Sequence, residues 1–283
     1  MNTIFKLRHF KHVARFTTGL IQLLKSRVRY DPLHRPHYAY AIRQAALQAK
    51  ALAMPSICAI EFGVAGGTGA RIMEQLATKI GGEVGLGINV YGFDTGQGQP
   101  APVDYRDCPY IWRAGQFRMD IEKLNSSLTS AKLVIGDVAE TVKTFVDEFD
   151  PAPIGFIAFD LDYYSSTKAA FQLLEQPHER FLPRVFCYFD DIVGPDFELH
   201  CEFTGELLAI NEFNSESATK KIARINGLRY KHDFPADWHA KMFVLHRFDH
   251  PKYCDFINPL GDCQLPLRLA GDNAVRPSSS SKG

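Results

Sequence analysis

The stretch that decides the fold runs from Glu61 to Gly69 and reads Glu-Phe-Gly-Val-Ala-Gly-Gly-Thr-Gly. It ends the apolar run Ile57–Phe62 and leads into a helical pattern over Thr68–Lys79, which predicts a strand, a tight turn and a helix in succession. Glycines let the backbone turn sharply and approach a ligand closely just before a helix N-terminus. The four that do so here are Gly63, Gly66, Gly67 and Gly69. The turn therefore predicts a pocket for a nucleotide-like ligand.

Short apolar runs separated by helical stretches continue this alternation along the chain, which is typical of βαβ units and a mostly parallel sheet. Further strands are predicted at Asn89–Phe93, Lys132–Ile135, Ile154–Phe159 and Val185–Phe189, with closing strands at Ala223–Leu228 and Met242–Leu245. Helices are predicted at Met119–Thr129, Ala139–Glu148, Ser166–Glu175 and Gly205–Phe213. We expect an α/β fold with a Rossmann-like, doubly wound sheet.

Residues 1–55 predict a helical extension in front of the sheet. No acid precedes Asp31, basic residues recur, and apolar residues stand at helical spacing, so the first part predicts a basic amphipathic helix. A second helix is predicted at Tyr38–Leu52. The apolar stripe could pack on the domain or on a second subunit, as in a homodimer, or lie on a membrane surface or in a transit peptide.

The rest of the chain divides into a main domain and a tail. The domain spans residues 56–269 and contains a loop at about 95–118 that is longer than an ordinary connection. Such loops are often lids or substrate walls. Residues 270–283 end in a serine-rich run and predict a disordered tail.

Composition excludes several classes of protein. The 283 residues carry 32 Lys and Arg against 32 Asp and Glu, so no global field draws the chain to nucleic acid. No run approaches the roughly 20 apolar residues of a spanning helix, and no secretory signal is present, so we expect a cytoplasmic protein without stable membrane insertion. The six cysteines form no CxxC pair, which favours idle thiols over a zinc site.

Three acids accompany the glycine turn. A turn of this kind serves dinucleotides and S-adenosylmethionine alike, but an acid two residues before the first glycine, Glu61, suits the amino group of the latter. Asp94 ends the second strand, where a carboxylate can accept both ribose hydroxyls, although it could also cap a helix or turn. Asp137 follows the third strand and could face an adenine, although Gly-Asp is also an ordinary turn.

Further acids end the fourth and fifth strands, in Phe159-Asp160-Leu161-Asp162 and Phe189-Asp190-Asp191. Ligands of doubly wound sheets bind outside the carboxyl ends of the strands, so these acids should surround one spot. They would repel one another unless a cation lay among them, and oxygen ligation suits Mg²⁺, Ca²⁺ or Mn²⁺. We predict a divalent-metal site formed by Asp160, Asp190 and Asp191, the alternative being acids that cap helices and face water.

The segments IEFGVAGGTG, VYGFDTGQGQP, IGDVAETV, FDLDYYSST and FDDI, in this order, resemble the macrocin O-methyltransferase family, which methylates sugar hydroxyls of antibiotics. The resemblance covers roughly Ile57–Asp191. It implies a class I, S-adenosylmethionine-dependent methyltransferase with a Mg²⁺ ion that binds substrate hydroxyls, held by Asp160, Asp190 and Asp191. Where the family commonly has Phe-Glu-Gly-Leu-Pro, this chain has Thr95–Pro100, which leaves the acceptor open.

For such an enzyme we expect a small hydroxylated acceptor, a sugar or another polar molecule. The metal would chelate two neighbouring hydroxyls and lower the pKa of one. A general base would take the proton. The candidates for this base are Asp160, Asp162, His200, His232 and His239.

Two rival interpretations remain from the sequence. A short-chain NAD(P)-dependent oxidoreductase would also contain a GxxxGxG turn, and Tyr164 to Lys168 fits YxxxK. The 97 residues from Gly67 to Tyr164 (164 − 67) are fewer than that resemblance requires, and the Asp190-Asp191 pair would be unexplained. The second rival is a non-catalytic, methyltransferase-like binding subunit.

Overall fold

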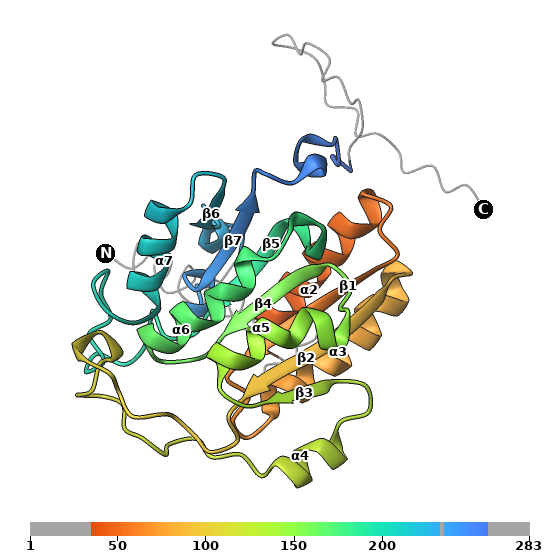
Figure 1. The fold of residues 1–283 in the computed structure, drawn as a ribbon. Coiled ribbons are helices and arrows are strands. Elements are labelled where there is room, and N and C mark those ends of the chain that lie inside the picture. The colour runs from red at the N-terminus through yellow and green to blue at the C-terminus, as the bar shows by residue number, and fades with distance from the viewer. Residues whose placement is uncertain (1–34, 233–234, 260–283) are drawn as a thin grey trace, which may run out of the picture.

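Seven strands form one sheet at the centre of residues 35–232 and 235–259, the parts of the chain that this computed structural model describes (Figure 1). The basic amphipathic helix predicted near the start of the chain and the tail predicted at 270–283 lie outside the described residues. The strands are β1 (Ser56–Phe62), β2 (Gly87–Asp94), β3 (Lys132–Ile135), β4 (Ile154–Phe159), β5 (Phe181–Phe189), β6 (Lys220–Arg224) and β7 (Met242–Arg247).

The strand order is β3-β2-β1-β4-β5-β7-β6. The first five strands pair in parallel, whereas β7 lies antiparallel to both β5 and β6. The sheet therefore winds outward from β1 in both directions. The predicted α/β fold with a mostly parallel, doubly wound sheet is confirmed.

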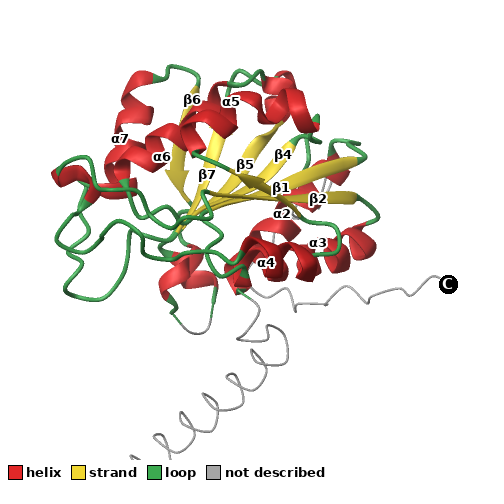
Figure 2. Cartoon of the chain, turned by 60° about the horizontal axis from the view of Figure 1, so that its bottom comes forward, coloured by secondary structure: helices red, strands yellow, loops and turns green. Residues whose placement is uncertain are grey.

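Helices cover both faces of the sheet. Figure 2 shows α5, α6 and α7 on one face and α2 and α3 on the other. The helices are α2 (Pro36–Ala51), α3 (Thr68–Val84), α4 (Ile121–Ser127), α5 (Val138–Phe149), α6 (Tyr164–Ala170) and α7 (Gly205–Glu216). None of these described helices has the length and apolar character that crossing a membrane requires.

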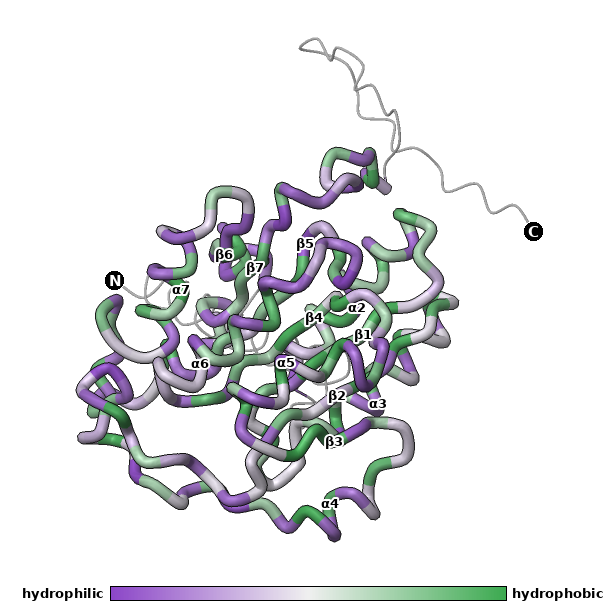
Figure 3. The backbone as a smooth tube through the Cα atoms, in the orientation of Figure 1, coloured by the Kyte–Doolittle hydropathy of each residue, from purple (hydrophilic) through white to green (hydrophobic). Residues whose placement is uncertain are grey.

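The core lies between the sheet and these two helical layers. On the α5–α7 face, Phe159 stacks between Phe62 and Phe189, with ring centroids 5.5 and 4.7 Å away. Strands buried on both faces are continuously apolar, and the central strands in Figure 3 are mostly green. On the other face, α2 buries a row of small residues against β4 and β5, although it belongs to the predicted N-terminal extension.

Most predicted elements differ from the structure by a few residues at their ends, and three differences have a clear physical reason. The strand β5 begins at Phe181, four residues before the predicted start, because Pro183 and Arg184 interrupt the apolar pattern at a point where the pairing with β4 is irregular. The strand β6 is shifted toward the N-terminus of Ala223–Leu228, because its first residue, Lys220, is buried with Glu175 as its partner. The helix predicted at Ser166–Glu175 divides into α6 and the 3-10 helix η2 (Phe171–Glu175).

Candidate active site

The glycine turn allows the backbone that follows β1 to lie directly against the end of β4. Gly63 has a φ of +84°, and a Cβ atom placed on it would lie 1.8 Å from the carbonyl oxygen of Asp160. The amide of Asp160 donates to the carbonyl of Phe62 at 2.9 Å, which holds the two strand ends side by side. Only glycine fits this position, because any side chain would collide with backbone.

Gly69 makes room for the carboxyl group of Glu61. A Cβ atom on Gly69 would lie 1.7 Å from Glu61 Oε1. The Glu61 side chain is only 1% exposed, and it accepts a hydrogen bond of 2.6 Å from the hydroxyl of Tyr38. Glu61 thus lies behind the turn and is not among the residues that line the cavity. Its contact with a cofactor amino group stays a prediction.

Burial raises the pKa of Glu61 from 4.5 to about 7, against the opposing effects of Arg35 and Tyr38. The folded state therefore binds a proton that the unfolded state releases between these two values, so this group lowers stability as the pH rises through that window. The Glu61→Gln variant cannot lose this proton, so we expect its free energy of unfolding to exceed that of wild type by an amount that grows with pH. The difference should reach up to about 3 kcal/mol as the pH is raised from about 5 to about 8. Urea unfolding at several pH values measures this.

The control is Glu148→Gln, at an exposed position on α5. An equal pH-dependent gain in both variants would show that the burial of Glu61 is not the cause. A Glu61→Gln curve parallel to that of wild type would contradict the raised pKa.

Asp94 and Asp137 both line the cavity, and both bind backbone amides. Asp94 Oδ2 accepts from the amides of Val64 and Ala65 at 2.9 and 2.8 Å, so the carboxylate fixes the glycine turn from the end of β2. Asp137 accepts from the amide of Ala139 at 2.9 Å and caps α5. Contacts of Asp94 with a ribose and of Asp137 with an adenine stay predictions.

A cavity of about 500 Å³ opens at the carboxyl ends of β1, β2, β4 and β5. The loop between β2 and α4, predicted as a lid, forms part of its wall. That loop contributes Thr95, Gly98, Gln99, Pro100, Trp112 and Phe117. Its anchor is Asp107, which is fully buried and accepts hydrogen bonds from the amide and the hydroxyl of Ser165 at 2.8 and 2.9 Å.

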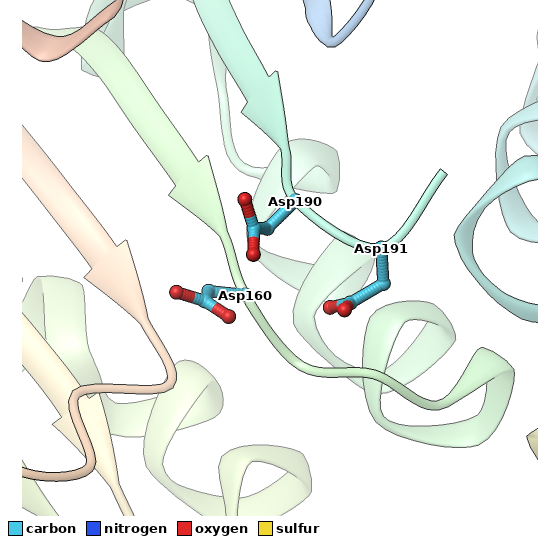
Figure 4. Close-up of side chains that lie close together, drawn as sticks. All are labelled: Asp160, Asp190 and Asp191. Carbon is cyan, nitrogen blue, oxygen red and sulfur yellow. The ribbon is translucent and has the colours of Figure 1, made fainter. Parts of the chain in front are cut away.

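The structure brings Asp160, Asp190 and Asp191 together on this wall (Figure 4). Each is half-buried, and one carboxylate oxygen from each lies within 4.8 Å of the others. Burial and the neighbouring Asp190 raise the pKa of Asp160 well above its usual range. Burial also opposes the charge on Asp190, but Lys241, with Nζ 3.2 Å from Oδ1, and the hydroxyl of Tyr188 outweigh it and lower the pKa of Asp190. Burial and the neighbouring Asp162 likewise raise the pKa of Asp191 well above its usual range. Without a cation among them, these carboxyl groups therefore resist full ionisation.

The candidate bases are placed differently with respect to this cluster. Asp162 lines the cavity, accepts a hydrogen bond from the Gln99 side chain, and has its pKa raised to about 6, chiefly by burial. His200 lies 2.7 Å from Glu198, which also lines the cavity. His232 and His239 stack on each other with centroids 4.4 Å apart and are not on the wall. Of the candidates, Asp160 and Asp162 therefore both lie on the cavity wall, and their role as a base stays a prediction.

The YxxxK pair of the oxidoreductase interpretation serves to pack helices. Tyr164 donates a hydrogen bond of 2.7 Å to Glu212, and Lys168 lies 3.1 Å from the same carboxylate. Both contacts join α6 to α7, and neither Tyr164 nor Lys168 lines the cavity. A cofactor bound in this cavity would therefore not contact Tyr164 or Lys168.

Three charged residues near the cluster escaped the sequence analysis. Arg35, just before α2, and Lys241, just before β7, line the cavity. Glu206 is fully buried and accepts a hydrogen bond of 3.0 Å from the amide of Asp191. Each comes from a segment without a motif, so only the folded arrangement reveals it.

Solved structures share this doubly wound α/β fold: CalS11, described as a calicheamicin methyltransferase, matches with a TM-score of 0.53 at 21% identity, over 80% of this chain and 85% of that one. The O-methyltransferase NovP matches with a TM-score of 0.51 at 14% identity, over 75% of this chain and 79% of that one. The sequence itself matches no protein-family profile and no curated protein.

Proposed function

We propose that this protein is an S-adenosylmethionine-dependent O-methyltransferase that uses a divalent metal to methylate a hydroxyl of a sugar-like or other small polar acceptor. The observation that carries the proposal is the presence of the glycine turn and the three clustered aspartates on the wall of one cavity. CalS11 and NovP, which share the fold, are named as a methyltransferase and an O-methyltransferase. The zero net charge favours a small acceptor over nucleic acid.

The cofactor would bind along the carboxyl edge of β1, β2 and β4, where doubly wound sheets bind nucleotides. Gly63 and Gly66 line the cavity there, and Asp94 and Asp137 lie farther along the same edge. A cavity of about 500 Å³ lies within the usual range for small-molecule sites. The methyl donor would thus lie beside the aspartate cluster.

The donor set of the cluster fits a hard divalent cation. Asp160, Asp190 and Asp191 offer only oxygen atoms, close enough to share one ion, and Mg²⁺ or Mn²⁺ prefers such ligands. Lys241 offsets only part of their charge. A bound metal would lower the pKa of an acceptor hydroxyl and orient it.

The side chains of the protein would contribute by orienting the acceptor and by accepting its proton. Methyl transfer from a sulfonium is an in-line displacement, so holding the acceptor in line supplies much of the rate. Trp112 and Phe117 from the lid loop line the cavity and would pack against the acceptor and exclude water. Asp162, held by Gln99, would accept the hydroxyl proton at Oδ1 or Oδ2.

The test combines binding and turnover. Calorimetry should show that the protein binds S-adenosylhomocysteine and not NADP(H), which separates this proposal from the oxidoreductase interpretation. Transfer of a labelled methyl group to sugar or catechol diols should then require Mg²⁺ and stop with EDTA. Binding of NADP(H) alone would overturn the proposal, and full turnover in EDTA would refute the role of the metal.

A further inference from the structure

The cavity is strongly acidic, and this creates a problem for one part of the proposed cofactor. Within the described residues its wall holds seven acids, which are Asp94, Asp137, Asp160, Asp162, Asp190, Asp191 and Glu198. Only two cationic side chains, Arg35 and Lys241, share this wall. The sulfonium and ammonium of S-adenosylmethionine suit such surroundings, but its carboxylate would be repelled unless a cation receives it.

Arg35 lies where the amino-acid end of the cofactor would be. Its Nη1 is 2.8 Å from the hydroxyl of Tyr38, 3.6 Å from Glu61 and 3.7 Å from Asp160. Glu61 is the next-to-last residue of β1, just before the glycine turn, and Asp160 follows β4, so Arg35 spans the two strand ends that flank the turn. The Arg35 side chain is 29% exposed and forms part of the cavity wall.

The contacts of Arg35 with the neighbouring acids are loose. Among the described residues its side chain makes a hydrogen bond from Nη1 to Tyr38, whereas its approaches to Glu61 and Asp160, at 3.6 and 3.7 Å, are longer than hydrogen bonds. A guanidinium presents donors in a planar fork that matches a carboxylate. Arg35 also has a left-handed backbone, with a φ of 37° and a ψ of 79°, which is an unfavourable conformation for a residue other than glycine.

Lys241 does not offer the same site. Its Nζ lies 3.2 Å from Asp190, within the aspartate cluster and therefore on the side of the acceptor. A carboxylate bound to Lys241 would meet Asp190 and Asp191 at short range. Arg35 also contacts one proposed metal ligand, Asp160, but it lies beside Tyr38 and Glu61 at the glycine turn, so it is the cation on the cofactor side of the cluster.

We propose that Arg35 forms a carboxylate subsite and binds the amino-acid carboxylate of the methyl donor. This inference rests on the proposed function and adds a residue to it. The subsite would let the protein distinguish S-adenosyl ligands that carry a carboxylate from those that lack one. It would also fix the methionine end of the cofactor, so that the methyl group faces the aspartate cluster.

Calorimetry with two probes tests the assignment. The probes are S-adenosylhomocysteine and its decarboxylated form, S-adenosyl-3-thiopropylamine, which keeps the adenosine, the sulfur and the amine. We expect Arg35→Gln to weaken binding of S-adenosylhomocysteine by about 10- to 100-fold and to leave the decarboxylated ligand within about two-fold of wild type. Arg35→Lys should lie between, because an ammonium keeps the charge but not the planar fork.

The matched control is Arg43→Gln on α2, the helix that follows Arg35, where Arg43 pairs with Glu83 at the surface at 2.7 Å. It should leave both affinities unchanged. A merely structural role of Arg35 would weaken both ligands alike and lower the melting temperature, and that result, or no loss for either ligand, would overturn the subsite. If wild type binds neither probe, the proposed function itself fails.

Discussion

Replacing Asp190 by asparagine is expected to lower the rate of methyl transfer about a thousand-fold while S-adenosylhomocysteine binds as before. A metal that polarises the acceptor supplies several kcal/mol to the transition state, and each 1.4 kcal/mol or so corresponds to a factor of ten. The amide of the substituted side chain would keep the shape of the carboxylate but not its charge, and the cofactor edge at the glycine turn is untouched. Initial rates with labelled cofactor, together with calorimetry, measure the two effects separately.

The control for this variant is Asp147→Asn, which removes an exposed carboxylate from α5. It should keep full activity. A parallel fall in cofactor affinity and rate in Asp190→Asn would instead place Asp190 in cofactor binding. Unchanged turnover would remove Asp190 from the mechanism.

Gly63→Ala is expected to destabilise the fold by about 3 kcal/mol and to abolish measurable binding of S-adenosylhomocysteine. The added Cβ would lie 1.8 Å from the Asp160 carbonyl oxygen, and the φ of +84° disfavours any side chain. Left-handed backbone costs about 1–2 kcal/mol for an L-residue, and overpacking against rigid neighbours costs a further 1–3 kcal/mol or so. Relief of the clash would move the turn away from β4 and distort the cofactor edge. Urea unfolding and calorimetry report on both.

Gly66→Ala serves as the comparison within the same turn. A Cβ atom on Gly66 would meet nothing within 4 Å, so stability should change by less than about 1 kcal/mol. Because Gly66 lines the cavity, Gly66→Ala can still change the affinity of the protein for the cofactor. The comparison with Gly63→Ala therefore uses only the free energies of unfolding. Equal destabilisation of the two variants would contradict the steric explanation.

The parallel strands of the sheet could be predicted because each is marked by a pattern of neighbouring residues in the sequence. The strands β3 and β4 have the predicted bounds, Lys132–Ile135 and Ile154–Phe159, since each is a short apolar run next to turn residues. The strand β6 was misplaced because Lys220 and Lys221 do not look like strand residues, and only the burial of Lys220 beside Glu175 explains its position. Hydrophobic periodicity and residue composition do not reveal a contact between two residues that lie far apart in the sequence.

The same limit applies to the candidate site. Asp160, Asp190 and Asp191 were predicted to meet because parallel strands end at one edge, and the structure brings them together. Arg35 and Lys241 follow from no motif, because they reach the cavity through the docking of α2 and β7. Glu61 has the spacing of a cofactor ligand, yet Tyr38 from α2 covers it, and nothing near Glu61 in the sequence indicates that contact.

The reversal of β7 also affects how the cavity is completed during synthesis. A parallel strand delivers the residue that follows it to the carboxyl edge, whereas β7 delivers Lys241, the residue that precedes it, whose carbonyl accepts a hydrogen bond of 3.0 Å from the amide of Phe189. During synthesis, Asp160, Asp190 and Asp191 are therefore all made before Lys241, the lysine that pairs with Asp190. The last of the three aspartates precedes it by 50 residues (241 − 191). Until β7 docks, Asp190 lacks the cation that lowers its pKa, so the last of the described strands to be made also supplies a counter-charge to the cluster.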